Sequence, residues 1–378
     1  MKVAILTWAT NTNNYGSILQ AYALQSFLED NKYENELLDY YPRVGDYQWP
    51  SSLGLYRKKV LKKIKRKFAT KKTKDNSWKE ELNRCCQSFV DKKLNVSKKY
   101  NGLEEIKEAN NDYDAFICGS DQIWSMQRVI NPVYYLTWVD EGKGKIAYAP
   151  SIPSGKFNDK KEKALIDNTK GFIDISIREE KAAKEIGYLL NRDIISALDP
   201  TLLVEDDFWV EKTKTHNNSK YILCYFLGQN SKYRQCVQET KDKTGYKVKV
   251  VPFNEESFDI NGEIKYGVGP EEFIDLVRNA EIVLTDSYHG TIFSIIFEKK
   301  FVLFKRFIDG EKKDENDRIY DLAEKLKIEE HISDASDFSY EKNKNPDYRV
   351  VKDYLRKERD KSRRFLLNSL KRCERDEQ

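Results

Sequence analysis

Short apolar runs alternate along this chain with longer segments in which apolar residues recur at helical spacing. The apolar runs at 2–7 and 36–40 predict buried strands, and residues 18–28 between them predict a helix. The second half repeats this order, because a strand at 221–227 is followed by a helix over 231–243. Alternating strands and helices of this kind are typical of an α/β fold built on parallel sheets.

Two such series predict two α/β domains with a cleft between them. We expect an N-terminal domain over residues 1–204, a linker over 205–220, a C-terminal domain over 221–345 and a C-terminal helix over 346–378. A length of 378 residues agrees with two domains rather than one.

The most informative stretch joins a strand to a helix in the second domain. An apolar run ends in Thr-Asp-Ser-Tyr-His-Gly-Thr at 285–291, and residues 291–297 predict an apolar helix. The start of a helix favours anions, because its first N–H groups have no intrahelical partner and its dipole is positive there. The alternative is that Ser287 or Asp286 only caps the helix, and that His289 is a packing residue. Position alone leaves both interpretations open.

A polar loop over residues 11–16 follows the first strand. Only Gly16 occurs in it, so the G-x-G-x-x-G motif of a dinucleotide cradle is missing. Asparagine and tyrosine side chains suit a ligand rich in hydroxyl groups, since they donate and accept hydrogen bonds. Asparagine equally supports turns and helix caps, and both interpretations stand.

Two further predicted strands end in residues that suit ligand binding or proton transfer. Residues 114–118 predict a strand that ends in Gly-Ser-Asp-Gln-Ile-Trp, where Asp121 offers an acid or base and Trp124 a stacking surface for a sugar. Arg178 follows the predicted strand at 174–177 and suits a phosphate or carboxylate. The alternatives are that Asp121 caps a turn, that Trp124 packs in the core, and that Arg178 forms an ion pair with a neighbouring glutamate.

The composition limits the setting of these residues. Charged residues make up 34% of the chain and the mean hydropathy is −0.74. No apolar run approaches the roughly 20 residues of a membrane span, and the first residues lack the apolar region of a signal peptide. None of the six cysteines forms a C-x-x-C pair. We therefore expect a cytoplasmic protein without structural zinc or any other metal site.

A basic helical segment at 56–82 stands out against a net charge of only +4. Residues 57–74 contain eleven Lys and Arg and no acid. A solvated helix that packs a narrow apolar stripe is one interpretation, and charge runs usually are of this type. Peripheral contact with an anionic membrane is a second. Nucleic-acid binding is a third, but no motif or interleaved aromatic residues support it, and we expect no nucleic-acid partner.

Five sequence blocks in this order resemble the polysaccharide pyruvyl transferase family. The blocks are Asn-Tyr-Gly-Ser-Ile-Leu-Gln-Ala-Tyr-Ala-Leu-Gln at 14–25, Gly-Ser-Asp-Gln-Ile-Trp at 119–124, Ser-Ile-Arg-Glu at 176–179, Asp-Pro-Thr-Leu-Leu at 199–203 and Ser-Tyr-His-Gly-Thr at 287–291. The resemblance implies two Rossmann-like domains facing a central cleft, as in GT-B glycosyltransferases, with the acceptor on the N-terminal and the donor on the C-terminal side. It implies transfer of pyruvate from phosphoenolpyruvate to sugar hydroxyls as a cyclic ketal, without a cofactor.

The resemblance also implies roles for individual residues. Arg178 and His289 match the family's cationic residues. Ser287 stands where several members have an arginine. Lys305 or Arg306 would supply the missing positive charge instead. The expected phosphoenolpyruvate-binding residues are Arg178, Ser287, Tyr288, His289, Gly290, Thr291 and Lys305. The expected catalytic residues are His289, Asp121 and Asp286. The expected acceptor-binding residues are Asn14, Tyr15, Gly16, Gln20, Ser120, Asp121, Gln122 and Trp124.

The leading hypothesis is therefore a pyruvyl transferase that acts on a bacterial capsule or exopolysaccharide, or on its lipid-linked precursor. A lipid-linked acceptor would place the protein at the inner face of the cell membrane, where the segment at 57–74 would contact anionic lipid. One alternative is a GT-B-type glycosyltransferase that uses a nucleotide sugar. Another is a non-catalytic glycan-binding protein of the same fold.

Overall fold

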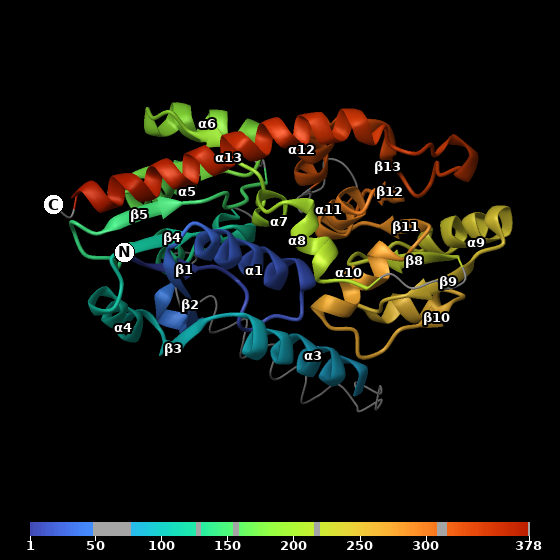
Figure 1. Ribbon diagram of the computed structural model, residues 1–378, viewed down its shortest axis with the longest axis horizontal. Helices are drawn as coiled ribbons and strands as arrows, with labels where there is room; N and C mark the ends of the chain where they lie inside the picture. The colour runs from blue at the N-terminus through green and yellow to red at the C-terminus, as the bar shows by residue number, and fades with distance from the viewer. Residues whose placement is uncertain (48–76, 126–129, 154–158, 215–219, 308–315, 377–378) are drawn as a thin grey trace.

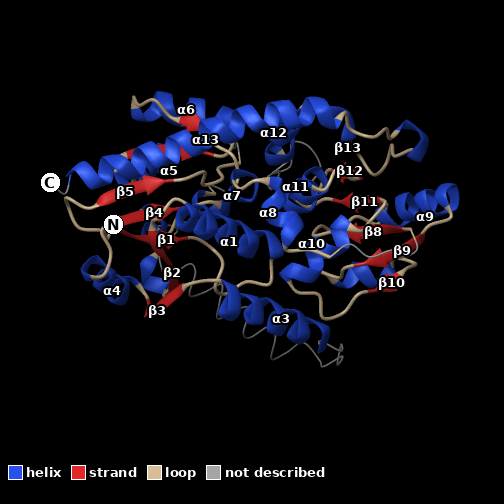
Figure 2. Ribbon diagram, in the orientation of Figure 1, coloured by secondary structure: helices blue, strands red, loops and turns tan. Residues whose placement is uncertain are grey.

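The computed structural model describes residues 1–47, 77–125, 130–153, 159–214, 220–307 and 316–376. The basic segment at 57–74 lies outside the described residues, and of the predicted helical segment 56–82 only the last residues are described, in a helix that begins at Ser77. The chain folds into two parallel sheets with helices packed on them (Figures 1 and 2).

The N-terminal sheet has seven strands within the described residues, in the order β3-β2-β1-β4-β5-β6-β7, and all pairs are parallel. Its strands are β1 (Lys2–Leu6), β2 (Glu34–Tyr41), β3 (Val96–Asn101), β4 (Ala115–Cys118), β5 (Gly144–Ala147), β6 (Asp174–Ile177) and β7 (Ile195–Ser196). The edge strand β3 was not predicted from the sequence, because its exposed Lys98 and Lys99 interrupt the apolar pattern.

The C-terminal sheet has six strands in the described part of the chain, in the order β10-β9-β8-β11-β12-β13, again all parallel. Its strands are β8 (Tyr221–Tyr225), β9 (Lys247–Val250), β10 (Glu263–Ile264), β11 (Ile282–Thr285), β12 (Lys300–Phe304) and β13 (Ile332–Ser333). The predicted α/β class with two domains in series is confirmed.

The strands are joined mainly by helices. The α-helices are α1 (Tyr15–Asp30), α3 (Ser77–Lys93), α4 (Leu103–Ile106), α5 (Asp159–Asn168), α6 (Glu180–Leu190), α7 (Pro200–Leu203), α8 (Asp206–Glu211), α9 (Tyr233–Thr244), α10 (Pro270–Arg278), α11 (Tyr288–Ile296), α12 (Asp317–Leu326) and α13 (Tyr348–Asp376). Short 3-10 helices cover Val44–Asp46, Lys107–Asn111, Asp121–Trp124, Pro132–Tyr135, Glu255–Asp259, Glu329–His331 and Tyr340–Lys342. Among the described helices, none combines the length and the apolar character that crossing a bilayer requires.

Helices α1 and α11 begin earlier than the sequence pattern predicted, because each has a side-chain cap. The Asn14 side chain accepts a hydrogen bond from the Gly16 N–H at 3.0 Å. Ser287 accepts one from the Gly290 N–H at 3.2 Å. Gly16 and His289 therefore lie in the first turns of helices rather than in loops.

The strand order places the loops after β1 and β4 and the start of α11 at equivalent points of the two sheets. In each sheet the chain order reverses beside the first strand, between β1 and β4 and between β8 and β11. Ligands of open α/β sheets bind at such a switch point, outside the carboxyl ends of the strands. The loops at 7–14 and 119–124 occupy it in the first sheet, and residues 286–290 in the second.

A continuous apolar core joins the two domains. It contains residues of both sheets, such as Ile5 and Val283. Tyr15 of α1 inserts into the C-terminal domain, where its ring stacks on Phe273 at 4.6 Å and lies 5.6 Å from Tyr225. Its hydroxyl donates a hydrogen bond to the Val268 carbonyl at 2.9 Å. An apolar interface of this kind opposes independent motion of the domains.

Helix α13 returns from the C-terminal to the N-terminal domain, and Figure 1 shows it running along one side of both. At its start the Tyr348 hydroxyl donates to the Lys299 carbonyl. Further along, the Ser362 hydroxyl accepts a hydrogen bond from the Leu198 N–H at 2.9 Å. The predicted C-terminal helix thus packs on the N-terminal domain and fixes the loop after β7.

The predicted linker at 205–220 contains a helix. Residues Asp206–Glu211 form α8, and the Trp209 side chain is buried in the shared core. Arg359 of α13 holds this segment, because its guanidinium contacts Glu205 at 2.7 Å and Asp206 at 2.6 Å. Residues 215–219 lie outside the described part of the chain.

The position of Tyr15 generates a stability prediction. Tyr15→Ala should lower the free energy of unfolding by about 3–5 kcal/mol, because it opens a cavity where the domains meet. Tyr15→Phe should cost about 1 kcal/mol, because only the hydrogen bond to Val268 is lost. The control is Tyr188→Ala, since Tyr188 is 93% exposed. Urea unfolding checks the order, and equal values for the two alanine variants would contradict it.

Candidate functional site

The first turns of α1 and α11 meet at the domain interface. A Cβ atom placed on Gly16 would lie 2.0 Å from His289 Nδ1 and 2.4 Å from its Cγ. No side chain fits there, so a glycine is needed at this point of α1 for the imidazole to lie against the helix. The contact brings together two sequence blocks that come from opposite domains.

Asp199 lies on the other side of the His289 ring. Its Oδ2 atom is 3.3 Å from His289 Nε2 and 2.9 Å from Arg178 Nη1, while its Oδ1 atom accepts hydrogen bonds from the Thr201 N–H and hydroxyl. Burial by itself raises the pKa of this carboxyl group, but the neighbouring His289 and Arg178 lower it well below its usual range. Asp199 is therefore an ionised carboxylate that contacts both Arg178 and His289.

Arg178 is buried and supported on several sides. Its guanidinium carbon lies 4.3 Å from the centre of the Tyr288 ring, and its Nε atom lies 3.4 Å from Glu179. Burial opposes the positive charge, but Tyr288, Glu179 and Asp199 raise the pKa of Arg178 above its ordinary value. Its Nη2 atom, like His289 Nε2, makes no hydrogen bond within the described residues. The ion pair with Glu179 was the alternative from the sequence, and it is present, but in the interior.

A cavity of about 590 Å³ lies beside this cluster, outside the carboxyl ends of the N-terminal strands. Asp121 and Ser17 both line it, and the Ser17 hydroxyl donates to Asp121 Oδ2 at 2.5 Å. Ser17 follows Gly16 in α1. The residue that lines the cavity and the residue that contacts His289 are therefore neighbours in the chain. Asp121 is thus a carboxylate that faces the cavity close to the domain interface.

The structure separates the predicted acceptor-binding residues into two groups. Asn14, Asp121 and Gln122 line the cavity. Tyr15 packs in the apolar core between the domains, and Gly16 lies against His289. For both residues the predicted contact with the acceptor is wrong, because the C-terminal domain covers them.

Gln20 and Ser120 are also buried, and they connect loops instead of facing the cavity. Gln20 Nε2 donates to Thr7 Oγ1 at 3.1 Å, and its Oε1 atom accepts from the Ser120 N–H at 3.2 Å. The Ser120 hydroxyl donates to the Ala149 carbonyl at 2.6 Å. These two residues position the strand ends around the cavity, so their predicted contact with the acceptor is corrected to a structural role.

Trp124 belongs to the core, and its prediction as a sugar-stacking surface is wrong. Only 1% of its surface is exposed. Its ring stacks on Tyr135 at 4.6 Å, and its Nε1–H donates to the Tyr134 carbonyl at 2.9 Å. The turn of residues 121–124 directs the indole back under the sheet edge rather than outward.

On the donor side, the Asp286 carboxylate accepts hydrogen bonds from the loop after β8 and from Tyr233 of α9, and its role as a general base stays a prediction. Its Oδ1 atom accepts from the Leu227 N–H and its Oδ2 atom from the Gly228 N–H, both at 2.7 Å. The Tyr233 hydroxyl also donates to Oδ2, at 3.1 Å. Asp286 is 2% exposed and thus holds the loop after β8 against the loop after β11.

The remaining residues of the motif shape the start of α11. Ser287 caps the helix, and the Thr291 hydroxyl donates back to the Ser287 carbonyl at 3.1 Å. A Cβ atom on Gly290 would lie 2.6 Å from Thr285 Oγ1. The N–H groups of Tyr288 and His289 have no intrahelical acceptor in this geometry, as at any helix start. These two N–H groups point to the same end of α11 as the His289 side chain.

Of the two candidate cations after β12, Arg306 lies closer to the motif. Its Nη2 atom donates to the Asp286 carbonyl at 2.8 Å, and its Nε atom lies 3.4 Å from Asp286 Oδ2. The Lys305 ammonium group instead lies 5.6 Å from the centre of the Tyr320 ring. Arg306 therefore brings positive charge next to Ser287, where the resemblance had predicted an arginine.

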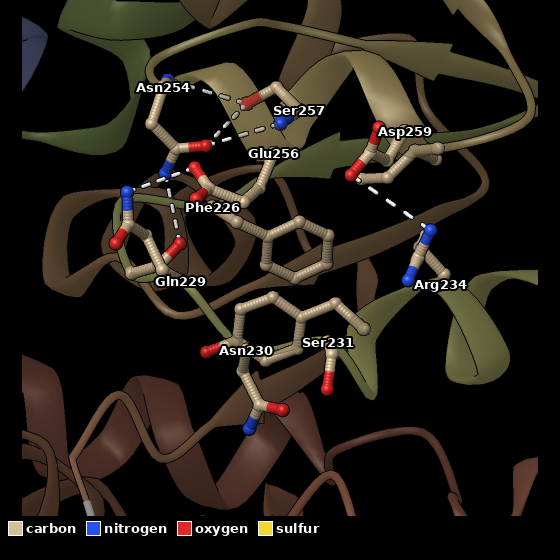
Figure 3. A pocket seen from close by; sticks show the side chains of 12 residues that line it. Phe226, Gln229, Asn230, Ser231, Arg234, Asn254, Glu256, Ser257 and Asp259 are labelled. Carbon is tan, nitrogen blue, oxygen red and sulfur yellow. Dashed lines mark hydrogen bonds and ion pairs between the residues drawn. The ribbon is translucent and has the colours of Figure 1, made fainter.

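A second cavity, of about 360 Å³, lies on the C-terminal domain between the loops after β8 and β9 (Figure 3). Its charged lining residues are Arg234, Glu256 and Asp259. Arg234 lies 3.9 Å from Asp259, and Gln229 donates to Glu256 at 2.9 Å. With two carboxylates and one guanidinium, this cavity is a poor place for a phosphate group.

The site contains no evident metal centre. Within the described ranges, no group of three or more His, Cys, Asp and Glu side chains has the arrangement of metal ligands. The cationic cluster at the domain interface instead offers a guanidinium, an imidazole and helix N–H groups, which are typical partners of an oxyanion.

Three residues around the site were not predicted from the sequence. Asp199 appeared only as the first residue of the sequence block at 199–203, without a role of its own. Its position after β7 was a usable signal, since ligands bind at the carboxyl ends of parallel strands. Trp8 follows β1 directly and carried the same signal. Ser17 carried none, because its role depends on its contact with Asp121 across the sheet.

The close approach of Gly16 to His289 predicts a coupled pair of variants. Alanine is favoured over glycine in a helix by up to about 1 kcal/mol. Gly16→Ala should nevertheless destabilise the protein, because the new methyl group collides with the imidazole. In the background of His289→Ala the same change should become neutral or stabilising. Unfolding free energies of the four proteins check this double-mutant cycle, and additive effects would contradict it.

The buried carboxylate of Asp199 predicts a pH-dependent variant. Asp199→Asn should cost about 3–5 kcal/mol at pH 7, because it leaves Arg178 with less compensating charge. A lowered pKa means that the carboxylate stabilises the fold above its ordinary pKa of about 3.9, and that this contribution is lost as the pH falls below it. The difference from wild type should therefore shrink in acid. Asp193→Asn, at an exposed position, is the control, and a difference that does not vary with pH would refute the assignment.

Comparisons with known proteins agree with this architecture. Among solved structures, UDP-GlcNAc 2-epimerase from Neisseria meningitidis is 10% identical, with a TM-score of 0.53 over 98% of this chain and 100% of that chain. A putative UDP-N-acetylglucosamine 2-epimerase from Listeria monocytogenes is 10% identical, with a TM-score of 0.49 over 96% and 91% of the two chains. ADP-heptose lps heptosyltransferase II from E. coli is 9% identical, with a TM-score of 0.39 over 95% and 99%.

The likeness to the Neisseria meningitidis epimerase concerns the fold alone, in which helices pack on two parallel sheets. A search of curated proteins finds no match. The sequence model of the polysaccharide pyruvyl transferase family matches residues 14–306, which include all five sequence blocks and the residues that meet at the domain interface. The chain belongs to the polysaccharide pyruvyl transferase family.

Proposed function

We propose that this protein transfers pyruvate from phosphoenolpyruvate to two hydroxyl groups of a sugar, forming a cyclic ketal and releasing phosphate. The acceptor would be part of a bacterial surface polysaccharide or of its lipid-linked precursor. The family assignment supports a transferase of this kind. The donor and the acceptor are the proposed part.

One observation carries the proposal more than any other. Arg178 Nη2 and His289 Nε2 are buried nitrogen atoms without a hydrogen bond in the described residues, and both side chains contact the same carboxylate, Asp199. An unpaired buried donor is costly, so Arg178 Nη2 favours a ligand that accepts hydrogen bonds, whereas His289 Nε2 already lies 3.3 Å from Asp199 Oδ2. Phosphoenolpyruvate has a phosphate and a carboxylate that suit such donors.

The chemistry requires an acid and a base. Protonation of C3 of phosphoenolpyruvate turns the methylene into a methyl group and gives C2 oxocarbenium character. One sugar hydroxyl adds to C2 and loses its proton, and the second displaces phosphate from C2 and loses its own. One hydroxyl proton balances the proton added at C3, and the other leaves with phosphate. Positioned side chains accelerate such proton transfers to C3 and from the two hydroxyl groups.

The geometry favours Asp121 as the base and His289 on the donor side. Asp121 faces the cavity and is held by the Ser17 hydroxyl, so its carboxylate can accept a proton from a bound sugar. His289 lies between Asp199 and Gly16 and serves as the acid or as a phosphate ligand. Arg178, Arg306 and the first N–H groups of α11 complete the anion site.

The alternatives have weaker support. A glycosyltransferase needs cationic groups for the diphosphate of a nucleotide sugar, but the cavity in the C-terminal domain has two carboxylates and one arginine (Figure 3). A non-catalytic glycan-binding protein needs only the acceptor cavity. It would leave the unpaired Nη2 atom of Arg178 without a role.

Release of phosphate tests the proposal directly. Wild-type protein with phosphoenolpyruvate and a panel of lipid-linked galactose- and mannose-type acceptors should release phosphate only when a suitable acceptor is present. His289→Ala and the closer replacement His289→Gln should lower kcat/KM for phosphoenolpyruvate by about 100-fold or more. Tyr188→Ala, at an exposed position, is the control. Full turnover by His289→Ala would sink the assignment, and stabilisation by nucleotide sugars instead of phosphoenolpyruvate would favour a glycosyltransferase.

A further inference from the structure

Helix α12 of the C-terminal domain reaches the segment of the N-terminal domain that carries Arg178. The helix packs against α13 (Figure 1). Two of its side chains, one helical turn apart, form an ion pair in which Lys325 Nζ lies 2.7 Å from Asp321 Oδ2. Only 12% of the Lys325 side chain and 14% of the Asp321 side chain are exposed. Each of the two also contacts the other domain, at the backbone beside Arg178.

The Lys325 ammonium group binds the carbonyl group of Arg178. Its Nζ atom donates to this oxygen at 2.6 Å and also contacts the Ser196 hydroxyl. That hydroxyl in turn donates to the Arg178 carbonyl at 3.2 Å. Hydrogen bonds from a charged donor are shorter and stronger than those between neutral groups. A cation of the C-terminal domain therefore fixes the peptide group that follows the Arg178 side chain.

Asp321 binds the same segment two residues further on. Its Oδ1 atom accepts a hydrogen bond from the Glu180 N–H at 2.5 Å. Glu180 begins α6, and the residue before it, Glu179, makes no side-chain capping bond within the described residues. The first N–H groups of a helix need acceptors from outside the helix, and a carboxylate there also suits the helix dipole. Asp321 is therefore a cap of α6 that the other domain supplies.

The N-terminal domain holds this segment from the opposite side. The Arg178 N–H donates to the Pro150 carbonyl at 3.2 Å. The Glu179 carboxylate accepts from the Ser151 hydroxyl at 2.6 Å and from the Ile152 N–H at 2.8 Å. The segment thus lies between the loop after β5 and α12. Because the desolvation of a buried ion pair offsets much of its attraction, the pair on α12 contributes position more than net stability.

The position of this backbone decides where the Arg178 guanidinium lies. The guanidinium carbon is 4.3 Å from the centre of the Tyr288 ring, in the first turn of α11, and the Nη2 atom makes no hydrogen bond within the described residues. Helices α11 and α12 belong to the same domain. By holding the backbone of Arg178, α12 therefore sets the guanidinium relative to α11. An oxyanion bound between them is sensitive to a shift of even 1 Å or so.

We propose that Asp321 and Lys325 are positioning residues of the donor site, which fix the backbone of Arg178 from the C-terminal domain and so set the distance between its guanidinium and α11. This inference rests on the proposed function, since it concerns the binding of the anionic donor. Both residues act through Arg178 rather than on the donor.

The variant Lys325→Met removes the ammonium group and keeps most of the length of the side chain. It should raise both the KM and the Kd for phosphoenolpyruvate about tenfold, because a displaced guanidinium binds the oxyanion less well, and leave the KM for the acceptor unchanged. A merely structural defect would reduce the amount of active protein, and thus kcat, without changing KM. Asp321→Ala should act like Lys325→Met, and Asp321→Asn should act less, because its amide oxygen still accepts from the Glu180 N–H. Initial rates and calorimetry with phosphoenolpyruvate alone measure these values.

Heteronuclear NMR of the arginine side chains gives a second measurement, which needs no substrate. The Nε–H signal of Arg178 is identified by its loss in Arg178→Lys. Lys325→Met should shift this signal, because the Nε atom lies 3.4 Å from Glu179 within the held segment. The matched control is Lys184→Met. Lys184 pairs with Glu180 at 3.2 Å on α6, but its side chain is 75% exposed, so the signal, KM and Kd should stay at wild-type values.

The outcomes separate this inference from the proposed function. If the wild type releases phosphate and Lys325→Met keeps its KM and Kd for phosphoenolpyruvate, the positioning role fails alone. Equal effects of Lys325→Met and Lys184→Met would overturn it as well. If the wild type neither binds phosphoenolpyruvate nor releases phosphate, but Lys325→Met shifts the Arg178 signal, the proposed function fails and the positioning of Arg178 stands.

Discussion

The contact between the first turns of α1 and α11 is the constraint on which the rest of this structure depends. Because Gly16 has no side chain, the His289 ring lies directly against α1. The same turn of α1 places Tyr15 in the C-terminal domain and Ser17 at the acceptor cavity. Three consecutive residues thus join the domains, admit the imidazole and support Asp121, so a shift of this turn would disturb all three at once.

The packing at this interface fixes the positions of two buried charged groups, Arg178 and Asp199. Taking Arg178 and Asp199 out of water is costly, and their attraction compensates only when the geometry is fixed. Tyr288 supports the guanidinium, and the Thr201 hydrogen bonds fix the carboxylate. The loop that carries Asp199 is in turn held by α13, through the hydrogen bond between Leu198 and Ser362. The C-terminal helix, although distant in sequence, therefore positions a group at the centre of the site.

The two sides of the site differ in charge, and this difference suits two different substrates. The interface around α11 gathers Arg178, His289 and Arg306, whereas the cavity after β1 has one carboxylate and no cation among its described lining residues. The positive charge of the interface and the cavity are therefore separate parts of the site. Parallel sheets make this arrangement accessible, because each has one switch point with polar loops, and the interface brings the two switch points together.

Local pattern in the sequence determined the α/β class, the order of the elements and the polar strand ends, because apolar periodicity and turn residues act over a few positions. It also predicted the blocks around Arg178, His289 and Asp121, which the structure places at the domain interface and at the cavity beside it. Only the tertiary structure decided which side chains face the cavity or the interface. Trp124 points into the core and Trp8 into the cavity, Asp286 ties two loops together, and Asp199 joins Arg178 to His289 across the interface. The reason is physical: the direction of a side chain at a strand end depends on what packs against it, and those partners come from distant parts of the chain.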